Sequence, residues 1–448
     1  MKLPRPFLES LESVKGFDRV AFEKVHASGE QVTSIRMNPA KTISQFPSSS
    51  ISQLPIPWTD YGFYLDTRPS FTFDPLFHAG CYYVQEASSM FLEQALKQTT
   101  DLSKPLRVLD LCAAPGGKST HILSLISKDS LLVSNEVIRS RANILKDNII
   151  KWGYNNAVVT NNDPRDFQKL ENYFDVIIVD APCSGSGLFR KDSEAIEEWS
   201  LNNVQLCSQR QQRILADVLP ALKEGGVLIY STCSYSKEED EEIGKWIMDN
   251  LKMENQVLQV EESWGIIESD CGYRFYPDKL KGEGFFTACF RERENKETSS
   301  FRMKGKLQKI TLKDMQTLQG WVKTDGLDFL SFLQKLHAIP IDLSAEINFL
   351  ISRLRVVNFG TIVGEIIWEK FVPDHALAMS LIVSENVRKI ELDDDKAIQY
   401  LKRKELNIDA ENKGWHLVTH GGYALGWINV LSNRINNYYP KELRILKD

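Results

Sequence analysis

Short apolar runs alternate with longer amphipathic stretches between Pro105 and Arg293, and this alternation constrains the fold more than any other feature. The runs RVLDLCA, SLLVSNEV and FDVIIVDAPC have the length and apolar content of buried strands. Between them, RSRANILKDNIIKWG carries apolar residues at helical spacing. Strands that alternate with helices predict an α/β domain with a doubly wound parallel sheet.

The alternation covers only the middle of a chain of 448 residues, which is too long for one hydrophobic core. We therefore expect three parts. Residues 1–104 form a small mixed α+β module, 105–293 the α/β domain and 300–448 a C-terminal domain. The polar segment RERENKETSS reads as the linker before the last part.

Local patterns add further expectations. NVQLCSQRQQRILADVLPALKEGG predicts one long helix that stops at its glycines, and Gly153 is a plausible left-handed end for the helix before it. In the last part, helices are expected near LDFLSFLQKL and AEINFLISRLRVV, and strands in the aromatic segment that begins GWHLVTHGGYALGWINVL.

Composition narrows the cellular setting. No apolar run approaches the length of a membrane span, and the N-terminus has no apolar signal segment, so we expect a cytoplasmic monomer without a membrane partner. The 7 cysteines are odd in number, scattered and never at C-x-x-C spacing. This pattern predicts neither a disulfide framework nor a metal site, and it leaves the thiols available for chemistry.

The charge of the chain contains indications both against and for binding to nucleic acid. The formal net charge of −6 argues against a nucleic-acid partner, but a whole-chain sum hides local patches. The stretch FRMKGKLQKITLK, at 301–313, holds five cations and no acid. It reads either as solvated surface or as a contact with phosphates.

The segment LDLCAAPGGKS follows the first strand of the predicted sheet, where its small residues allow a ligand to approach the backbone. A triphosphate-binding loop would need glycine five positions before Gly117, but Cys112 stands there. The dinucleotide pattern G-x-G-x-x-G is absent too. The interpretation that remains for this segment is a binding site for a nucleoside cofactor without a pyrophosphate, such as S-adenosylmethionine.

Three acids at consecutive strand ends agree with that cofactor. Glu136 lies about 20 residues past the glycine turn, where an acid can bond both ribose hydroxyls. Asp163 follows the third strand, within reach of an adenine edge, and Asp180 ends the fourth. Any one of them could be a helix cap or a solvated acid, but three in register point to one crevice.

Two cysteines, Cys183 and Cys233, close neighbouring strands and therefore face the same crevice. Lys118, Arg190 and Lys191 are candidate sources of the positive charge that favours a thiolate. A thiolate that adds to carbon 6 of a pyrimidine makes carbon 5 nucleophilic enough to accept a methyl group. Asp180 can stabilise ring nitrogen 3, and a second thiol can serve in release. The residues alone do not separate the two thiols.

The motifs DLCAAPGGKS, DAPCSGSGLFRKD and YSTCS resemble those of the NOL/NOP/Sun family of RNA cytosine-5 methyltransferases. The resemblance implies a class I, Rossmann-like S-adenosylmethionine-dependent methyltransferase domain. It implies that Cys233 is the nucleophile, that Cys183 assists release and that Asp180 contacts the cytosine, with Lys118 near the target base. The cofactor residues that it implies are Cys112, Ala113, Ala114, Pro115, Gly116, Gly117, Lys118, Glu136, Asp163 and Asp180.

The resemblance extends to both ends of the chain. SIRMNPAK and GCYYVQEASSM resemble the family's N-terminal, RNA-recognition-motif-like module and its junction to the catalytic domain. FVPDHALAMSL and GYALGWINVLSNRINNYYPKELR resemble the C-terminal part of the bacterial RsmF-like branch of the family. The resemblance implies that this part is PUA-like. It also implies methylation of 16S ribosomal RNA, which is the activity of that branch. Two departures are Ser186, where that branch often has Glu, and EEDEE in place of E-N-E.

Methylation of RNA, in 16S ribosomal RNA or the small ribosomal subunit, is the main hypothesis. Because the target base must leave its stack, unpaired RNA is the expected substrate. Trp427, Tyr438 and Tyr439 are candidates for base stacking, although Trp427 fits core packing better. The alternatives are a transfer RNA methyltransferase, a non-catalytic RNA-binding or ribosome-assembly protein, and a DNA cytosine-5 methyltransferase. The second thiol argues against DNA.

Overall fold

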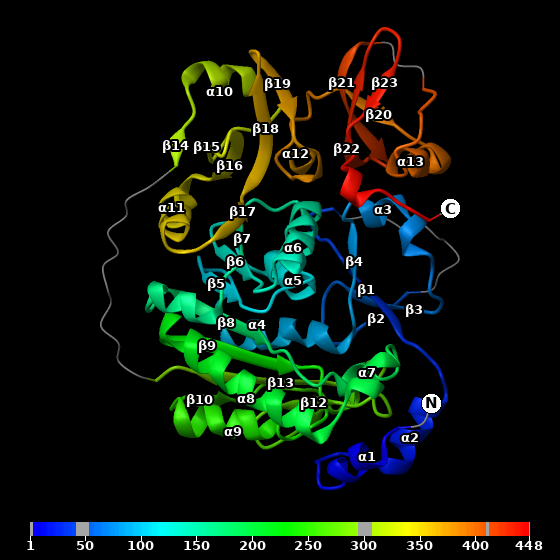
Figure 1. Cartoon of the computed structure of the whole chain (residues 1–448), viewed down its shortest axis with the longest axis vertical. Coiled ribbons are helices and arrows are strands. Elements are labelled where there is room, and N and C mark those ends of the chain that lie inside the picture. Colours follow the sequence, from blue (N-terminus) through cyan, green and yellow to red (C-terminus); the bar gives the residue numbers. More distant parts are fainter. Residues whose placement is uncertain (1–2, 42–52, 294–306, 409–411, 448) are drawn as a thin grey trace.

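A computed structural model describes residues 3–41, 53–293, 307–408 and 412–447 (Figure 1). Residues 301–306 of the basic stretch lie outside the described ranges. Four sheets organise these residues: a ten-stranded central sheet, a four-stranded N-terminal sheet, and sheets of five and four strands in the C-terminal part.

The centre of the large sheet is parallel, in the order β9-β8-β5-β6-β7. This confirms the predicted fold class. Its strands are β5 (Arg107–Asp110), β6 (Leu131–Asn135), β7 (Ala157–Thr160), β8 (Phe174–Asp180) and β9 (Leu222–Thr232). Chain order reverses between β5 and β8, and a crevice opens at such a switch point, beyond the carboxyl ends of the strands.

Antiparallel strands extend both sides of this sheet. On the β9 side lie β13 (Phe285–Arg291), β12 (Tyr273–Phe275) and β11 (Ile267–Glu268), with β10 (Glu254–Gln256) also paired to β13. On the other side β7 pairs with β17 (Val356–Phe359), which arrives from the C-terminal part of the chain. The central sheet is therefore completed by a segment from beyond the linker.

Helices cover both faces of the sheet, and two hydrophobic clusters fill the layers. The apolar sides of α8 (Leu201–Val218), α9 (Glu241–Asn250) and α11 (Ser344–Arg353) pack in one cluster. Those of α4 (Leu92–Thr99), α5 (Gly117–Leu125) and α6 (Arg139–Trp152) pack in the other. Helix α6 ends at Gly153 with φ of 98°, as predicted.

The prediction of one long helix up to its glycines was wrong at its end. Helix α8 stops at Val218 because Pro220 removes a backbone donor, and a short 3-10 turn follows. Gly225 and Gly226 lie inside β9. The short helix α7 (Glu194–Glu198) precedes α8.

The described residues of the N-terminal module form short helices and an antiparallel sheet in the order β2-β3-β1-β4. Its elements are α1 (Arg5–Leu11), α2 (Arg19–Ala27), β1 (Thr33–Met37), β2 (Gln53–Pro55), β3 (Gly62–Leu65), α3 (Pro75–His78) and β4 (Tyr82–Val84). The family-like segment SIRMNPAK covers most of β1 and the turn after it.

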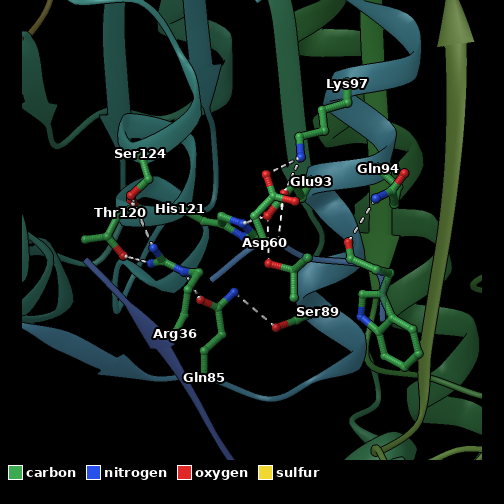
Figure 2. A network of polar contacts seen from close by, with 12 residues as sticks. Arg36, Asp60, Gln85, Ser89, Glu93, Gln94, Lys97, Thr120, His121 and Ser124 are labelled. Atoms are coloured by element: carbon green, nitrogen blue, oxygen red, sulfur yellow. Dashed lines mark hydrogen bonds and ion pairs between the residues drawn. The ribbon is translucent and has the colours of Figure 1, made fainter. Parts of the chain in front are cut away.

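Buried polar side chains join this module to the α/β domain (Figure 2). Arg36 of β1, which is 0% exposed, donates to the Gln85 side chain, to Thr120 and Ser124 of α5, and to the Gly117 carbonyl. Beside it, the buried Glu93 carboxylate accepts from Thr59, from Lys97 and from the ring of His121. The junction is therefore held by directional bonds as well as by apolar packing.

Two further residues of SIRMNPAK, Asn38 and Lys41, bond the N-terminal module to the α/β domain. The Asn38 amide donates to the carbonyls of Gly80 and Trp152. The Lys41 ammonium donates to those of Ala79 and Lys151. Carbonyls at the end of α6 therefore receive bonds from the module, as those at the start of α5 do.

The C-terminal part contains two sheets. The first has the order β14-β15-β16-β18-β19, and the second the order β20-β21-β22-β23. The strands are β14 (Gln308–Lys309), β15 (Leu327–Phe332), β16 (Lys335–Pro340), β18 (Thr361–Ile367), β19 (Lys370–Pro373), β20 (Lys389–Glu391), β21 (Gly414–His420), β22 (Tyr423–Val430) and β23 (Ile435–Asn437), with helices α10 (Leu312–Leu318), α12 (His375–Met379) and α13 (Asp394–Leu401).

Two local predictions for this part were right and one was wrong. AEINFLISR forms α11, and the aromatic segment forms β21 and β22. LDFLSFLQKL is the β15–β16 hairpin instead of a helix. Leu333 and Gln334 turn the chain with φ of 49° and 66°, a left-handed turn that places both strands in the sheet. Among the described residues, no helix is long and apolar enough to cross a membrane.

Candidate active site

A cavity of about 400 Å³ opens at the switch point of the central sheet. This is within the size range of sites for small organic ligands. Its walls come from the N-terminal module, the loop after β5, the end of β8, the segment after β9 and the segment before β13. The lining residues are Tyr83, Val84, Gln85, Glu86, Ser89, Asp110, Cys112, Ala113, Ala114, Pro115, Gly117, Lys118, Asp180, Leu188, Cys233, Glu283, Gly284 and Phe285.

The loop between β5 and α5 is shaped by its glycines. Gly116 precedes the helix with φ of 116°, a conformation that side-chain-bearing residues rarely adopt. A Cβ atom on Gly117 would lie 3.4 Å from the Tyr83 ring, so the helix start and the N-terminal module approach closely. Ala113 donates its backbone N–H to the Asn135 carbonyl at 2.8 Å, which fixes the loop to the end of β6.

Asp110, at the end of β5, is a fully buried acid in the cavity wall. Its Oδ2 accepts from the Ser119 hydroxyl at 2.6 Å. Among the residues that the structure describes, its Oδ1 has no hydrogen-bond partner. Burial raises the pKa of this carboxyl to about 7. A buried oxygen without a partner in a cavity wall is suited to a polar ligand group.

Lys118 and Asp180 form an ion pair across the crevice, with Nζ 2.8 Å from Oδ2. The other carboxylate oxygen of Asp180 accepts from the Ser231 hydroxyl at 2.8 Å. Lys118 stands on the first turn of α5 and Asp180 on the last residue of β8. The pair places one cation and one carboxylate at the same edge of the cavity.

The two cysteines predicted from strand ends meet, with their sulfur atoms 3.1 Å apart. Cys233 lines the cavity, and Cys183, in the loop after β8, contacts the Cys233 sulfur without being a lining residue itself. The hydrogen bond with Cys233, together with burial, raises the pKa of the Cys183 thiol. The contact allows one thiol to donate its S–H to the sulfur of the other.

Gly187 permits the close approach of the two thiol-bearing segments. Its backbone N–H donates to the Cys233 carbonyl at 2.9 Å. A Cβ atom there would lie 2.8 Å from that carbonyl oxygen and 2.3 Å from the Gly284 carbonyl oxygen. Any side chain at this position would therefore force the segments apart.

Not every residue predicted for the cofactor lines the cavity. Glu136 is buried just beyond β6, where it accepts from the Ile138 backbone and pairs with Arg141 at 3.5 Å. Asp163 is exposed and caps a 3-10 turn by accepting from the Arg165 backbone. Gly116 is part of the loop but not of the lining. The cofactor roles of these residues stay predictions.

The basic residues expected near the thiols differ in their surroundings. Lys118 is in the cavity wall. Arg190 is nearly buried, donates to the Gly282 and Glu30 carbonyls and lies 3.6 Å from Glu283. Lys191 lies 3.8 Å from the same carboxylate. Of these three residues, only Lys118 lines the cavity.

Several lining residues were not singled out from the sequence. Asp110 stands inside the loop motif, and Gln85 and Glu86 stand inside GCYYVQEASSM, so both motifs already contained the signal. Glu283 and Phe285 precede and begin β13, where the sequence shows only an apolar strand. Segments of this kind become cavity walls only through tertiary packing.

The aromatic candidates for base stacking separate by exposure. Trp427 is 1% exposed and donates its ring N–H to the Asp374 carbonyl, so it is a core residue, as its pattern favoured. Tyr439 is 3% exposed, which leaves no face open for stacking. Tyr438 is 42% exposed and lies against Trp415.

Four family models match successive segments of this chain. They are the N-terminal domain of 16S rRNA methyltransferase RsmF (3–87), 16S rRNA methyltransferase RsmB/F (97–291), the RsmF rRNA methyltransferase first C-terminal domain (324–381) and the methyltransferase RsmF PUA domain (387–445). Together with the fold and the site, these four matches define an RNA methyltransferase.

Whole-chain relatives sharpen this result. Ribosomal RNA small subunit methyltransferase F of Aliivibrio fischeri is 30% identical over 438 residues, which cover 92% of this chain and 90% of the relative. The chain therefore belongs to the ribosomal RNA small subunit methyltransferase F family.

Solved structures match about two thirds of the chain. A methyltransferase homologue protein from Pyrococcus horikoshii is 26% identical with a TM-score of 0.53, and the match covers 65% of this chain and 100% of that one. NSun6 from Pyrococcus horikoshii, solved with SFG, has a TM-score of 0.55 at 20% identity, over 65% of this chain and 99% of that one. The latter likeness shows the fold alone.

Proposed function

We propose that this protein transfers a methyl group from S-adenosylmethionine to carbon 5 of a cytosine in 16S ribosomal RNA, through a covalent bond between Cys233 and carbon 6. The observation that carries the proposal is the pair of sulfur atoms, 3.1 Å apart, at the edge of a cavity that also contains Lys118 and Asp180. Family membership supports RNA as the substrate class, and the names of the relatives support the ribosomal small subunit.

The cavity suits the proposed cofactor. The small residues Ala113, Ala114 and Gly117 leave room beside the backbone, and Asp110 offers a carboxyl oxygen without a partner among the described residues. Glu136 would hold the ribose hydroxyls, Asp163 the adenine edge, and Asp180 the region beside the reacting group. When bound, S-adenosylmethionine supplies an electrophilic methyl group.

The chain's own residues would act on the cytosine. The Cys233 sulfur forms a bond to carbon 6, and electron density moves to ring nitrogen 3. Asp180, which Lys118 and Ser231 hold in place, stabilises that nitrogen when its carboxyl group is protonated and donates an O–H hydrogen bond to it. This makes carbon 5 a nucleophile toward the methyl group. A base then takes the carbon-5 proton, the electron pair of that C–H bond re-forms the double bond between carbons 5 and 6, and the Cys233 thiolate leaves. Cys183, whose sulfur lies 3.1 Å from that of Cys233, assists this release.

A covalent trap separates the roles of the two thiols. Labelled 16S ribosomal RNA and S-adenosylmethionine would be incubated with wild type, Cys183→Ala and Cys233→Ala, and then run on a denaturing gel. We expect a persistent protein–RNA band with Cys183→Ala alone. A band only with Cys233→Ala would reverse the roles. The absence of both a band and methyl transfer would refute this proposal for 16S RNA, and a parallel transfer RNA arm tests that substrate.

The cellular setting proposed for this activity is the cytoplasm, with the protein acting as a monomer. All seven cysteines lie among the described residues as free thiols, as a thiol-dependent reaction in a reducing compartment requires. Size-exclusion chromatography with light scattering would give the oligomeric state directly.

A further inference from the structure

Glu239 lies beneath the two thiol-bearing segments, between β9 and α9, and is 0% exposed. Its Oε1 accepts from the Ser184 backbone N–H at 2.7 Å. Its Oε2 accepts from the hydroxyls of Ser184 and Ser234, each at 2.6 Å. Ser184 follows Cys183 and Ser234 follows Cys233, so one carboxylate binds the residue after each thiol.

This arrangement is an unfavourable place for a charge. Within the described parts of the chain, no Lys, Arg or His forms an ion pair with Glu239, and burial raises the pKa of its carboxyl. A buried carboxylate without a cation is costly even when hydrogen-bonded. An uncharged side chain would fill the same space at lower cost. The presence of a carboxylate here is therefore best explained by the three hydrogen bonds that it accepts from Ser184 and Ser234.

We propose that Glu239 is a positioning residue, which holds the Cys183 and Cys233 sulfur atoms against each other by binding both Ser184 and Ser234. It touches neither substrate nor cofactor and acts only through the two serines. The inference deepens the proposed function and rests on it, because the distance between the sulfurs matters only if both thiols work on one cytosine.

Other links between the two segments lie on either side of Cys183 and Ser184. On the strand side, the Ala181 N–H donates to the Ser231 carbonyl at 2.8 Å. Beyond Ser184, the Gly187 N–H donates to the Cys233 carbonyl, the Tyr235 N–H donates to the Ser186 hydroxyl at 3.0 Å, and the hydroxyls of Ser186 and Ser234 lie 3.4 Å apart. Loss of Glu239 would leave the segments in contact but would free the thiol-bearing residues to move. Misplacement by about 1 Å is enough to slow a reaction by about 100-fold.

Oxidation of the two thiols measures their juxtaposition without RNA or cofactor. Diamide takes two electrons and two protons from the pair; the S–S bond forms, and the N=N bond of diamide is reduced to a hydrazine. The rate of formation of the Cys183–Cys233 disulfide would be followed by mass spectrometry of the digested protein. The variants are Glu239→Ala, Glu239→Gln and, as the matched control, Glu242→Gln, whose side chain is exposed.

We expect Glu239→Ala to form this disulfide at least about 10-fold more slowly than wild type. Glu239→Gln should stay within about 3-fold, because its oxygen can accept from the Ser184 N–H and the serine hydroxyls can rotate to accept from its amide. Glu242→Gln should match wild type. Methyl transfer by Glu239→Ala should fall in parallel, while calorimetry shows S-adenosylmethionine bound within about 2-fold of wild-type affinity.

A wild-type disulfide rate in folded Glu239→Ala, or a Gln variant as slow as the Ala variant, would overturn the proposal. If Glu239→Ala does not fold, Ser234→Ala serves, since it cuts only the Cys233 segment from the carboxylate; an unchanged rate there is equally contradictory. Failure of the covalent trap with all RNAs would refute the proposed function alone, because the disulfide rates are measured without RNA.

Discussion

The two halves of the cavity are held in place in different ways. The half that contains the loop after β5 is braced from outside the catalytic domain, because Arg36 of the N-terminal module bonds the Gly117 carbonyl and the Thr120 hydroxyl. The half that contains the thiols is braced from within that domain, by Glu239 and Gly187. Cofactor affinity should therefore depend on the N-terminal module, whereas the geometry of the thiols should not.

The contact of the N-terminal module with α5 requires the Arg36 guanidinium to be buried, which is energetically costly. Among the described residues, its guanidinium donates to neutral oxygens, and the group lies 4.6 Å from the centre of the Trp152 ring. Burial lowers its pKa to about 9. Such a group is stable only while its many donors are satisfied, which ties the module to α5 and α6.

The largest expected effect is on methyl transfer, and it comes from a change confined to the half of the cavity that contains the thiols. Cys233→Ala should lower methyl transfer by at least about 10⁴-fold, because removal of an attacking nucleophile abolishes the covalent route. S-adenosylmethionine binding in calorimetry should stay within about 2-fold of wild type. A variant that loses cofactor binding to the same extent as transfer would show that the two halves are not independent.

Arg36→Met should affect the other half. It keeps the length of the side chain but leaves the bonded oxygens of α5 buried without donors, and the free energy of unfolding should fall by about 3 to 5 kcal/mol. Cofactor affinity should fall about 10-fold while the rate of the Cys183–Cys233 disulfide stays unchanged. The control is Arg19→Met, an exposed arginine of the same module. A slower disulfide in the Arg36 variant would contradict the comparison.

Asp110, in the half of the cavity that contains the loop after β5, should make the stability of the protein depend on pH. Its pKa is about 7 in the folded protein against the ordinary 3.8, so the folded state keeps a proton that the unfolded chain releases between these values. Stability should therefore fall by about 2 to 4 kcal/mol as pH rises from 4 to 7. Urea unfolding of Asp110→Asn, compared with wild type at each pH, should lack this contribution. Parallel curves for the two proteins would refute the assignment.

The smallest effect concerns Glu136. Glu136→Ala should weaken S-adenosylmethionine binding by about 1 to 2 kcal/mol, since a charge-assisted bond to ribose hydroxyls is lost. Asp163→Ala, at an exposed helix-capping acid, provides the comparison within the same proposed set. Calorimetry that finds normal affinity for Glu136→Ala would remove this residue from the cofactor site.

The sequence predicted the central sheet and the meeting of the two cysteines because both follow from local order. Alternating strands and helices determine which strand ends share an edge, and Cys183, Cys233 and Asp180 lie at such ends. Arg36 and Glu239 escaped because their roles depend on distant partners. Nothing local in EEDEE marks any of its acids as buried, yet its Glu239 is buried among groups from the loops after β8 and β9.

The error at LDFLSFLQKL has a similar origin. Its apolar residues fit helical spacing, and its turn contains neither glycine nor asparagine, the usual signals of a left-handed turn. Pairing with β18 on one side and β14 on the other decides its state. A short apolar segment can satisfy both periodicities, so its neighbours in the fold select between them.

Strand β17 has a consequence for how the protein is made. Val356 to Phe359 pair with β7, whose four residues are all buried, so the catalytic sheet stays open along that side until this late segment has been synthesised. A nascent chain that already contains both thiols and the whole cofactor loop would therefore present an unpaired strand to its surroundings.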